Sequence, residues 1–366
     1  MKMTEEAQRA THGDEKCVDL VFKGGGVKGF ALVGALCVLE ERGFQVQRAA
    51  GTSAGAIVAT LWAAGYRAPE IHDIIAGQDF TQFTDPTSRD RIPIADQGWN
   101  LLWNQGIYQG KYFHEWMREL LRARGIVTFG DLRAFPANGD SRYAYKVQVT
   151  ASDTTARCLL VLPKDAAKLG IDNTDELEVA LAVRMSMSVP IFFEPVHFLN
   201  MQTKRKHTIV DGGILSNFPV RLFDSDGPPR WPSFGLKLVD ADPRKSLADS
   251  ISLKQPQGPV EETLDLIKSL IETMIGAHDR QYLELDQFVR TITIPTLGIS
   301  STQFSLTKQQ SSALLQSGRD AAESFLQGWD SAGGFPAYVA ALRSEPRPTR
   351  RHTALEHMRQ TTNRER

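Results

Sequence analysis

The chain has 366 residues, of which 42% are hydrophobic and 23% are charged, as in an ordinary globular protein. This composition excludes a collagen, a coiled coil and a wholly disordered chain. The 42 basic and 43 acidic residues give a net charge of −1, which argues against a dedicated nucleic-acid-binding protein. Three widely spaced cysteines suit a reducing compartment and exclude a disulfide scaffold.

The pattern predicts one domain over residues 17–331. A disordered tail is expected at 1–16, and a basic, disordered tail is expected at 332–366. The N-terminal residues lack the apolar core of a signal peptide, and no run reaches the roughly 18 apolar residues of a membrane span. We therefore expect a cytoplasmic protein.

Strand and helix patterns alternate at the start of this domain. Short apolar runs at 18–22 and 45–50 end at glycines, which indicates buried strands, and helical patterns follow at 27–41 and 54–64. Alternation with short connections predicts a parallel sheet with right-handed crossovers. Further along, strands are predicted at 143–151, 208–210, 234–239 and 288–294, and helices at 113–121, 177–186, 260–282 and 307–326.

A glycine-rich segment from Gly24 to Gly29 separates the first strand from the first helix. Glycines at such a point let backbone N–H groups converge, and the helix N-terminus adds positive potential, so the segment predicts an anion cradle. The same glycines satisfy the GxGxxG pattern of dinucleotide-binding proteins. A phosphate-binding P-loop is disfavoured because Phe30 stands where a lysine would be needed.

The second motif, Gly51-Thr52-Ser53-Ala54-Gly55, joins the second predicted strand to the second helix. A GxSxG sequence in this context is typical of a nucleophile elbow, which exposes the serine hydroxyl on a tight turn. Gly51 and Gly55 are needed because a larger side chain would clash with that turn. A simple helix-capping serine is the alternative interpretation.

The third motif, Asp211-Gly212-Gly213, follows an apolar strand. By itself it is typical of an ordinary turn, but a nucleophilic serine also needs a proton acceptor, which is usually histidine. None of the eight histidines occurs in a recognisable turn at the end of a strand. His197 and His207 come closest, so both remain candidates beside Asp211.

In this order, the sequences GGGVKG, GTSAG and DGG resemble those of the patatin-like phospholipase family. Similar blocks occur at 106–110, 127–132, 186–196 and 211–220, so the resemblance spans roughly residues 18 to 327. It implies a three-layer α/β/α fold with a mostly parallel central sheet. It also implies a lipid acyl hydrolase that uses a Ser–Asp dyad.

The resemblance assigns roles to particular residues. Ser53 would be the nucleophile and Asp211 its proton acceptor, while the amides of Gly24, Gly25 and Gly26 would form the oxyanion hole. Lys28 stands where many relatives carry arginine, which keeps the charge but loses the planar fork. The substrate would be a phospholipid, a lysophospholipid or another fatty-acyl ester.

No cofactor or metal is expected, because the sequence has no HExxH motif, no Cys/His cluster and no EF-hand loop. Two alternatives remain. A dinucleotide-binding module would have an acidic residue at the end of the second strand, where this chain has Gly51-Thr52-Ser53. An inactive lipid-binding scaffold would not need both Ser53 and Asp211.

Aromatic residues are concentrated between 99 and 116. Trp99 and Trp103 share a face at helical spacing, after a polar stretch that suggests a surface position. Tryptophan favours the interface between membrane and water, so both are candidates for lipid contact and for peripheral attachment to a membrane. Packing in the core is the alternative.

Overall fold

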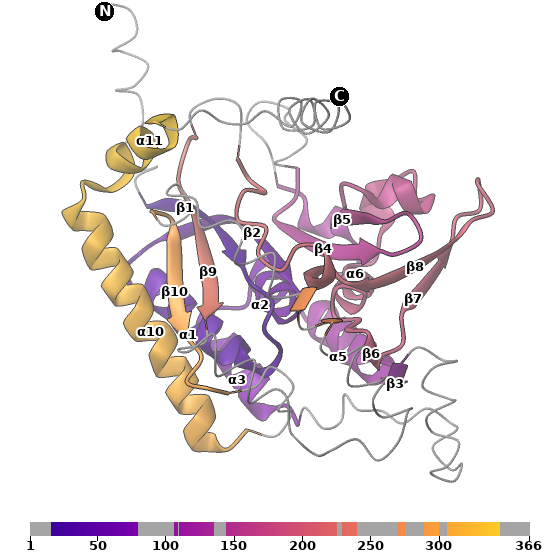
Figure 1. Ribbon diagram of the computed structural model, residues 1–366, viewed down its shortest axis with the longest axis horizontal. Helices are drawn as coiled ribbons and strands as arrows, with labels where there is room; N and C mark the ends of the chain where they lie inside the picture. Colours follow the sequence, from indigo (N-terminus) through magenta and orange to yellow (C-terminus); the bar gives the residue numbers. More distant parts are fainter. Residues whose placement is uncertain are drawn as a thin grey trace, which may run out of the picture.

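The computed structural model describes residues 16–79, 106–108, 110–134, 144–224, 229–239, 270–271, 273–274, 289–299 and 306–344. A mostly parallel sheet runs through these residues, with strand order β10-β9-β1-β2-β4-β8-β7 and β5 paired to β4 (Figure 1). Its strands are β1 (Cys17–Phe22), β2 (Gln45–Thr52), β4 (Val147–Asp153), β5 (Cys158–Leu162), β7 (Val196–Leu199), β8 (Lys206–Asp211), β9 (Ser233–Val239) and β10 (Thr291–Pro295).

The strands from β10 to β4 pair in parallel, whereas β5, β7 and β8 pair antiparallel to their neighbours. A small second sheet pairs β3 (Gly106–Tyr108) with β6 (Ile191–Phe193). In β1 all six residues are buried, as expected for a central strand covered on both faces.

Helices flank the sheet. They are α1 (Gly29–Glu41), α2 (Ala54–Ala63), α3 (Ala68–Gly77), α5 (Lys111–Arg122), α6 (Val179–Ser186), α10 (Lys308–Ser331) and α11 (Gly334–Ser344). This architecture confirms the predicted three-layer α/β/α fold with a mostly parallel central sheet.

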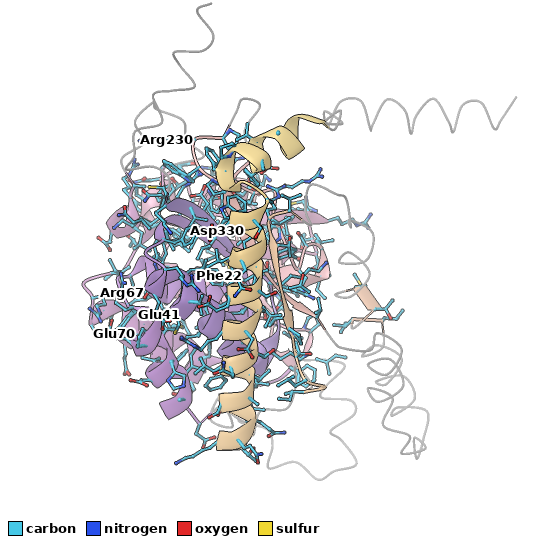
Figure 2. All side chains as sticks on the ribbon, turned by 90° about the vertical axis from the view of Figure 1, so that its left-hand side faces the viewer. Phe22, Glu41, Arg67, Glu70, Arg230 and Asp330 are labelled. Carbon is cyan, nitrogen blue, oxygen red and sulfur yellow. The ribbon has the colours of Figure 1, made fainter. Side chains whose placement is uncertain are left out.

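Helix α1 packs against α10, from the other end of the chain. A side chain at Gly34 or Gly318 would collide with the backbone of the opposite helix, so the two helices touch backbone to backbone at this crossing. Figure 2 faces α10 and shows it running along the domain beside Glu41, which accepts hydrogen bonds from Arg319 at 2.8 and 2.7 Å.

The structure differs from the sequence predictions in several places. The first predicted helix begins as a separate 3-10 turn, η2 (Gly26–Lys28), before α1. The strand predicted from 143 begins at Val147. The domain does not end at 331, because α11 follows within the expected tail and buries Tyr338 to 1% exposure.

The aromatic side chains of Trp329 and Tyr338 pack together, with ring centroids 5.7 Å apart, which accounts for the ordered helix α11. Most of the helix predicted at 260–282 lies outside the described residues, as do 1–15 and 345–366. Within the described part of the chain, no helix has both the length and the apolar character needed to cross a membrane.

Candidate active site

Ser53 occupies a sharp turn between β2 and α2. Its φ of 52° and ψ of −126° lie in a region that residues other than glycine rarely adopt, and such strain is typical of functional turns. A Cβ at Gly51 would lie 2.5 Å from the Ala56 nitrogen, and one at Gly55 would lie 2.7 Å from the Lys23 carbonyl oxygen. Both glycines of the GxSxG motif are therefore required by close backbone contacts.

The sheet register brings Asp211 to the same edge as Ser53. Thr52 pairs with Thr150 of β4, and the next residue of β4 pairs with Asp211 of β8. The two side chains thus come from strands that flank β4, at the level where β2 ends. Gly212 completes the turn, because a Cβ there would lie 2.5 Å from the Thr150 carbonyl oxygen.

The Asp211 carboxyl is buried, with 2% exposure. Burial raises its pKa from the ordinary 3.8 to about 6, while the N–H of Gly213 and the Ser53 side chain act in the lowering direction. Its Oδ1 accepts from the Gly213 N–H at 2.6 Å, whereas Oδ2 has no hydrogen-bond partner among the described residues. The Ser53 hydroxyl also donates to Met187 Sδ at 3.5 Å, and sulfur is a weak acceptor.

The residues at the end of α6 form hydrogen bonds with both Ser53 and Asp211. The Ser186 hydroxyl accepts from the Ser53 N–H at 2.8 Å, and the Ser188 carbonyl oxygen accepts from the Asp211 N–H, also at 2.8 Å. Met187 lies between them against the Ser53 hydroxyl. Three consecutive residues therefore fix the position of Ser53 relative to Asp211.

A buried arginine, Arg184, supports this segment through hydrogen bonds. Arg184 donates to the Ser188 hydroxyl at 2.5 Å and to the Glu194 carbonyl oxygen at 2.8 Å. Its guanidinium lies against Gly110, where a side chain would collide with it. The end of α6 is thus supported by the residue that follows β6 and by the residue that precedes α5.

The glycine-rich loop after β1 lies against the same site. A Cβ at Gly24 would collide with the Asn217 side chain and would lie 3.2 Å from Ser53 Cβ. The N–H of Gly24 donates to the Asn217 carbonyl oxygen at 3.2 Å. Asn217 Oδ1 would also lie 3.1 Å from a Cβ at Gly213. This buried asparagine therefore stands between the glycine loop and the turn of Asp211.

The remainder of the loop has different spatial requirements. A side chain at Gly25 would collide with Leu238, and Gly26 has a φ of 57°, which favours glycine. A Cβ at Gly29 would meet no atom within 4 Å, so the structure gives no packing reason for that glycine. Lys28 is buried at the end of η2.

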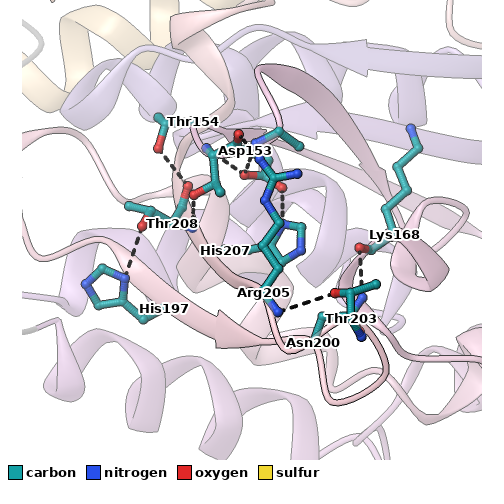
Figure 3. Close-up of polar contacts among 11 residues, drawn as sticks. Asp153, Thr154, Lys168, His197, Asn200, Thr203, Arg205, His207 and Thr208 are labelled. Atoms are coloured by element: carbon teal, nitrogen blue, oxygen red, sulfur yellow. Dashed lines mark hydrogen bonds and ion pairs between the residues drawn. The ribbon is translucent and has the colours of Figure 1, made fainter.

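The two candidate histidines, His197 and His207, lie on the outer strands β7 and β8, and Figure 3 shows their polar contacts. Nδ1 of His207 pairs with Asp153 Oδ2 at 2.6 Å. His207 lies on β8, four residues before Asp211. At about 3.3 Å per residue this places it roughly 13 Å along the strand. His197 lies on β7, one strand farther out, beside the Thr208 hydroxyl at 3.3 Å. Neither can accept the Ser53 proton directly.

The sequence patterns did not identify several residues that lie around Ser53. Asn217, Ser186 and Met187 lie in the blocks that resemble the patatin-like family, but their sequence positions alone gave no role. Trp99 and Trp103 lie outside the described residues. Among the residues that the structure does describe, no group of three His, Cys, Asp or Glu side chains could hold a metal ion.

Proteins from bacteria and from a virus are similar to this chain. YqhO, an uncharacterized protein of Bacillus subtilis, is 40% identical over 313 residues, which cover 85% of this chain and 99% of YqhO. A probable lipid hydrolase, 463L of Invertebrate iridescent virus 6, is 22% identical over 208 residues, which cover 56% of this chain and 62% of that protein.

VipD from Legionella pneumophila shares the fold, with a TM-score of 0.51 at 19% identity; the match covers 85% of this chain and 67% of VipD. The family model for patatin-like phospholipases matches residues 20–224, from the strand before the glycine loop to beyond the Asp-Gly-Gly turn. The chain therefore belongs to the patatin-like phospholipase family, whose members are lipid acyl hydrolases.

Proposed function

We propose that this chain cleaves fatty-acyl esters of phospholipids or lysophospholipids, with Ser53 as nucleophile and Asp211 as proton acceptor. The observation that carries the proposal is the strained turn of Ser53 beside a buried carboxyl whose Oδ2 is unengaged among the described residues. Membership of the patatin-like phospholipase family supports the same chemistry.

Burial makes Asp211 a better base. An exposed aspartate, with a pKa near 4, accepts a proton from serine poorly. The pKa of about 6 increases the basicity of the carboxylate roughly a hundredfold and leaves it largely ionised near neutral pH. Little energy is needed to turn the Ser53 hydroxyl from the Met187 sulfur towards Asp211, since the sulfur is a weak acceptor.

The reaction proceeds in two acyl-transfer steps. Ser53 Oγ bonds to the ester carbonyl carbon while its proton passes to Asp211. The tetrahedral intermediate then collapses, and the ester C–O bond breaks as the alcohol leaves with that proton. Water attacks the acyl-serine in the same manner and gives its proton to Asp211, which returns it to Ser53 as the fatty acid is released.

The loop amides stabilise the oxyanion in both steps. Because the Gly24 N–H already donates to the Asn217 carbonyl, we assign this role to Gly25 and Gly26, which lie closer to the start of α1. Each such donor is worth roughly 3 to 4 kcal/mol in the transition state.

The test combines active-site labelling with product analysis. A fluorophosphonate probe should label Ser53 in the native protein. Mass spectrometry should detect free fatty acid after incubation with phosphatidylcholine or lysophosphatidylcholine. Ser53→Ala should remove the label and lower the rate roughly a thousandfold or more. Ser312→Ala, at an exposed position on α10, should change neither.

Two results would overturn the proposal. One is a Ser53→Ala variant that is free of native enzyme yet keeps more than a few per cent of the activity. The other is a native protein that binds lipid without being labelled, which would identify an inactive lipid-binding scaffold.

A further inference from the structure

The hairpin of β7 and β8 extends beyond the edge of the sheet that carries Ser53. β4 runs past the level of Thr52 and ends at Asp153, which pairs with Ile209 of β8. β8 begins three residues farther out, at Lys206. From Lys206 to Asp211 the strand spans about 17 Å at roughly 3.3 Å per residue. In Figure 1 the hairpin runs outward from the centre of the sheet.

The tip of this hairpin exposes apolar and basic side chains together. Leu199 is 50% exposed and Met201 is 62% exposed. Leu199 pairs in register with Lys206, so the two side chains share one face of the hairpin. Lys204 and Arg205 are exposed next to them. We call these five residues the hairpin tip.

The charges around the hairpin tip balance one another. Arg157 is exposed on the neighbouring turn between β4 and β5, while the charge of Lys168 is matched by Asp165 at 2.9 Å. A second acidic residue is Asp172, whose two oxygens accept from Gln202 Nε2 at 2.9 and 2.8 Å. The cations of the hairpin tip therefore outnumber the acidic groups around it.

Hydrogen bonds hold this arrangement in place (Figure 3). Asn200 is buried, and its Oδ1 accepts from the N–H groups of Gln202 and Thr203, each at 3.0 Å. Arg205 donates to the Thr155 carbonyl oxygen at 2.7 Å. His207 of β8 pairs with Asp153 at the end of β4. These hydrogen bonds hold the turn on which Leu199 and Met201 are exposed.

We propose that the hairpin tip docks the protein on an anionic lipid surface, an inference that rests on the lipid-hydrolase function proposed above. Leu199 and Met201 enter the interfacial layer, and Lys204, Arg205 and Lys206 pair with lipid phosphates. Apolar side chains flanked by cations are the combination that binds such interfaces, since burial and charge attraction add. Docking by this element turns the edge of the sheet that carries Ser53 towards the bilayer.

The experiment measures binding of the full chain to vesicles. All proteins carry Ser53→Ala, so that lipid is not consumed, and the vesicles contain phosphatidylcholine with or without phosphatidylglycerol. Lys204→Glu/Lys206→Glu should weaken binding to the anionic vesicles at least about tenfold, and Met201→Ser should weaken it about threefold or more. The control Arg122→Glu/Lys308→Glu makes the same charge change at exposed positions on α5 and α10 and should stay within about twofold of the parent.

The inference is overturned if the hairpin variants bind as tightly as the control, or if phosphatidylcholine alone is bound as tightly as the anionic mixture. An acidic protein as the true partner would give the first of these results. Thermal unfolding checks that each variant is folded, and Lys204→Gln/Lys206→Gln provides a milder pair with a smaller loss expected.

Hydrolysis separates this inference from the proposed function. With Ser53 intact, Lys204→Glu/Lys206→Glu should cleave a short, water-soluble ester at the native rate but vesicle lipid more slowly. If no ester is cleaved by the native protein while the binding differences hold, the hydrolase function fails and the docking surface stands. If both substrates are cleaved equally by variant and native protein, the docking surface fails alone.

Discussion

The Asp211 carboxyl is buried, and its pKa of about 6 lies above the ordinary value of 3.8. The folded protein therefore binds the proton of the Asp211 carboxyl more tightly than the unfolded chain does. The contribution of Asp211 to stability is fully present below about pH 4 and is lost as the pH rises through about 6. Above that pH the native state keeps an ionised carboxylate in a place where ionisation is unfavourable.

The ionised form is the one that accepts the Ser53 proton, so activity should follow its titration. We expect kcat/KM for a soluble ester to rise about tenfold per pH unit on the acid side and to level off near pH 6. The measurement is a pH profile on the native enzyme, with circular dichroism confirming the fold at each pH. An acid limb centred near pH 4 would show that the carboxylate is solvated and would contradict this environment.

Asp211→Asn should abolish activity and yet stabilise the fold at neutral pH. Asparagine can still accept from the Gly213 N–H, but it carries no charge that burial disfavours. The variant should gain up to about 3 kcal/mol over the native protein at pH 8, because a difference of about two pKa units corresponds to that energy. The gain should vanish near pH 4. Urea unfolding at both pH values measures it.

Asp131→Asn is a control for which the opposite change in stability is expected at pH 8. The N–H groups of Thr128 and Val127 lower the pKa of Asp131, so loss of its charge should destabilise the protein at pH 8. If Asp211→Asn were also destabilising at pH 8, burial of charge would not be the dominant effect at that site.

At the scale of elements, the contact between the end of α6 and the nucleophile turn is testable through Ser186. Ser186→Ala leaves the Ser53 N–H without its acceptor, which should lower stability by about 1 to 3 kcal/mol. Displacement of the nucleophile should lower kcat about tenfold to a hundredfold, with KM little changed. Urea unfolding and steady-state kinetics on a soluble ester measure both effects.

Thr60→Val is the matched control for Ser186→Ala. The Thr60 hydroxyl is buried on α2 and has no hydrogen-bond partner among the described residues. Its removal should leave kcat unchanged and cost no stability. A Ser186→Ala variant with lowered stability and a native kcat would mean that Ser186 supports the fold without positioning Ser53.

The sequence predicted those features of the site that depend on neighbouring residues. The tight turn of Ser53 follows from Gly51 and Gly55, and the parallel sheet follows from alternating strands and helices. The support from Ser186 and Asn217 could not be predicted, because it joins residues more than 100 positions apart. Short strands such as β6 and β7 also escaped, since three or four residues carry too little periodicity.

At the scale of the whole molecule, helices α1 and α10 connect the two ends of the domain by packing together at Gly34 and Gly318. Gly318→Ala should destabilise the protein by about 1 to 3 kcal/mol, because a Cβ would meet the backbone of α1 at Ala31. The melting temperature should fall by about 2 to 4 °C for each kcal/mol.

Gly328→Ala makes the identical chemical change on the same helix, where a Cβ meets nothing within 4 Å. It should stabilise the protein by about 0.5 to 1 kcal/mol. Equal melting temperatures for the two variants would contradict a backbone contact between α1 and α10.

The strand order has a consequence for how the protein is made. β1 lies between β2 and β9, so its partner on one side leaves the ribosome about 200 residues after β1 itself. At about 5 to 20 residues per second, that interval lasts roughly 10 to 40 s. Throughout it, a largely apolar strand has one unpaired edge, the kind of edge that joins other chains. The nascent protein is therefore most in need of chaperones while the segment between β1 and β9 is being synthesised.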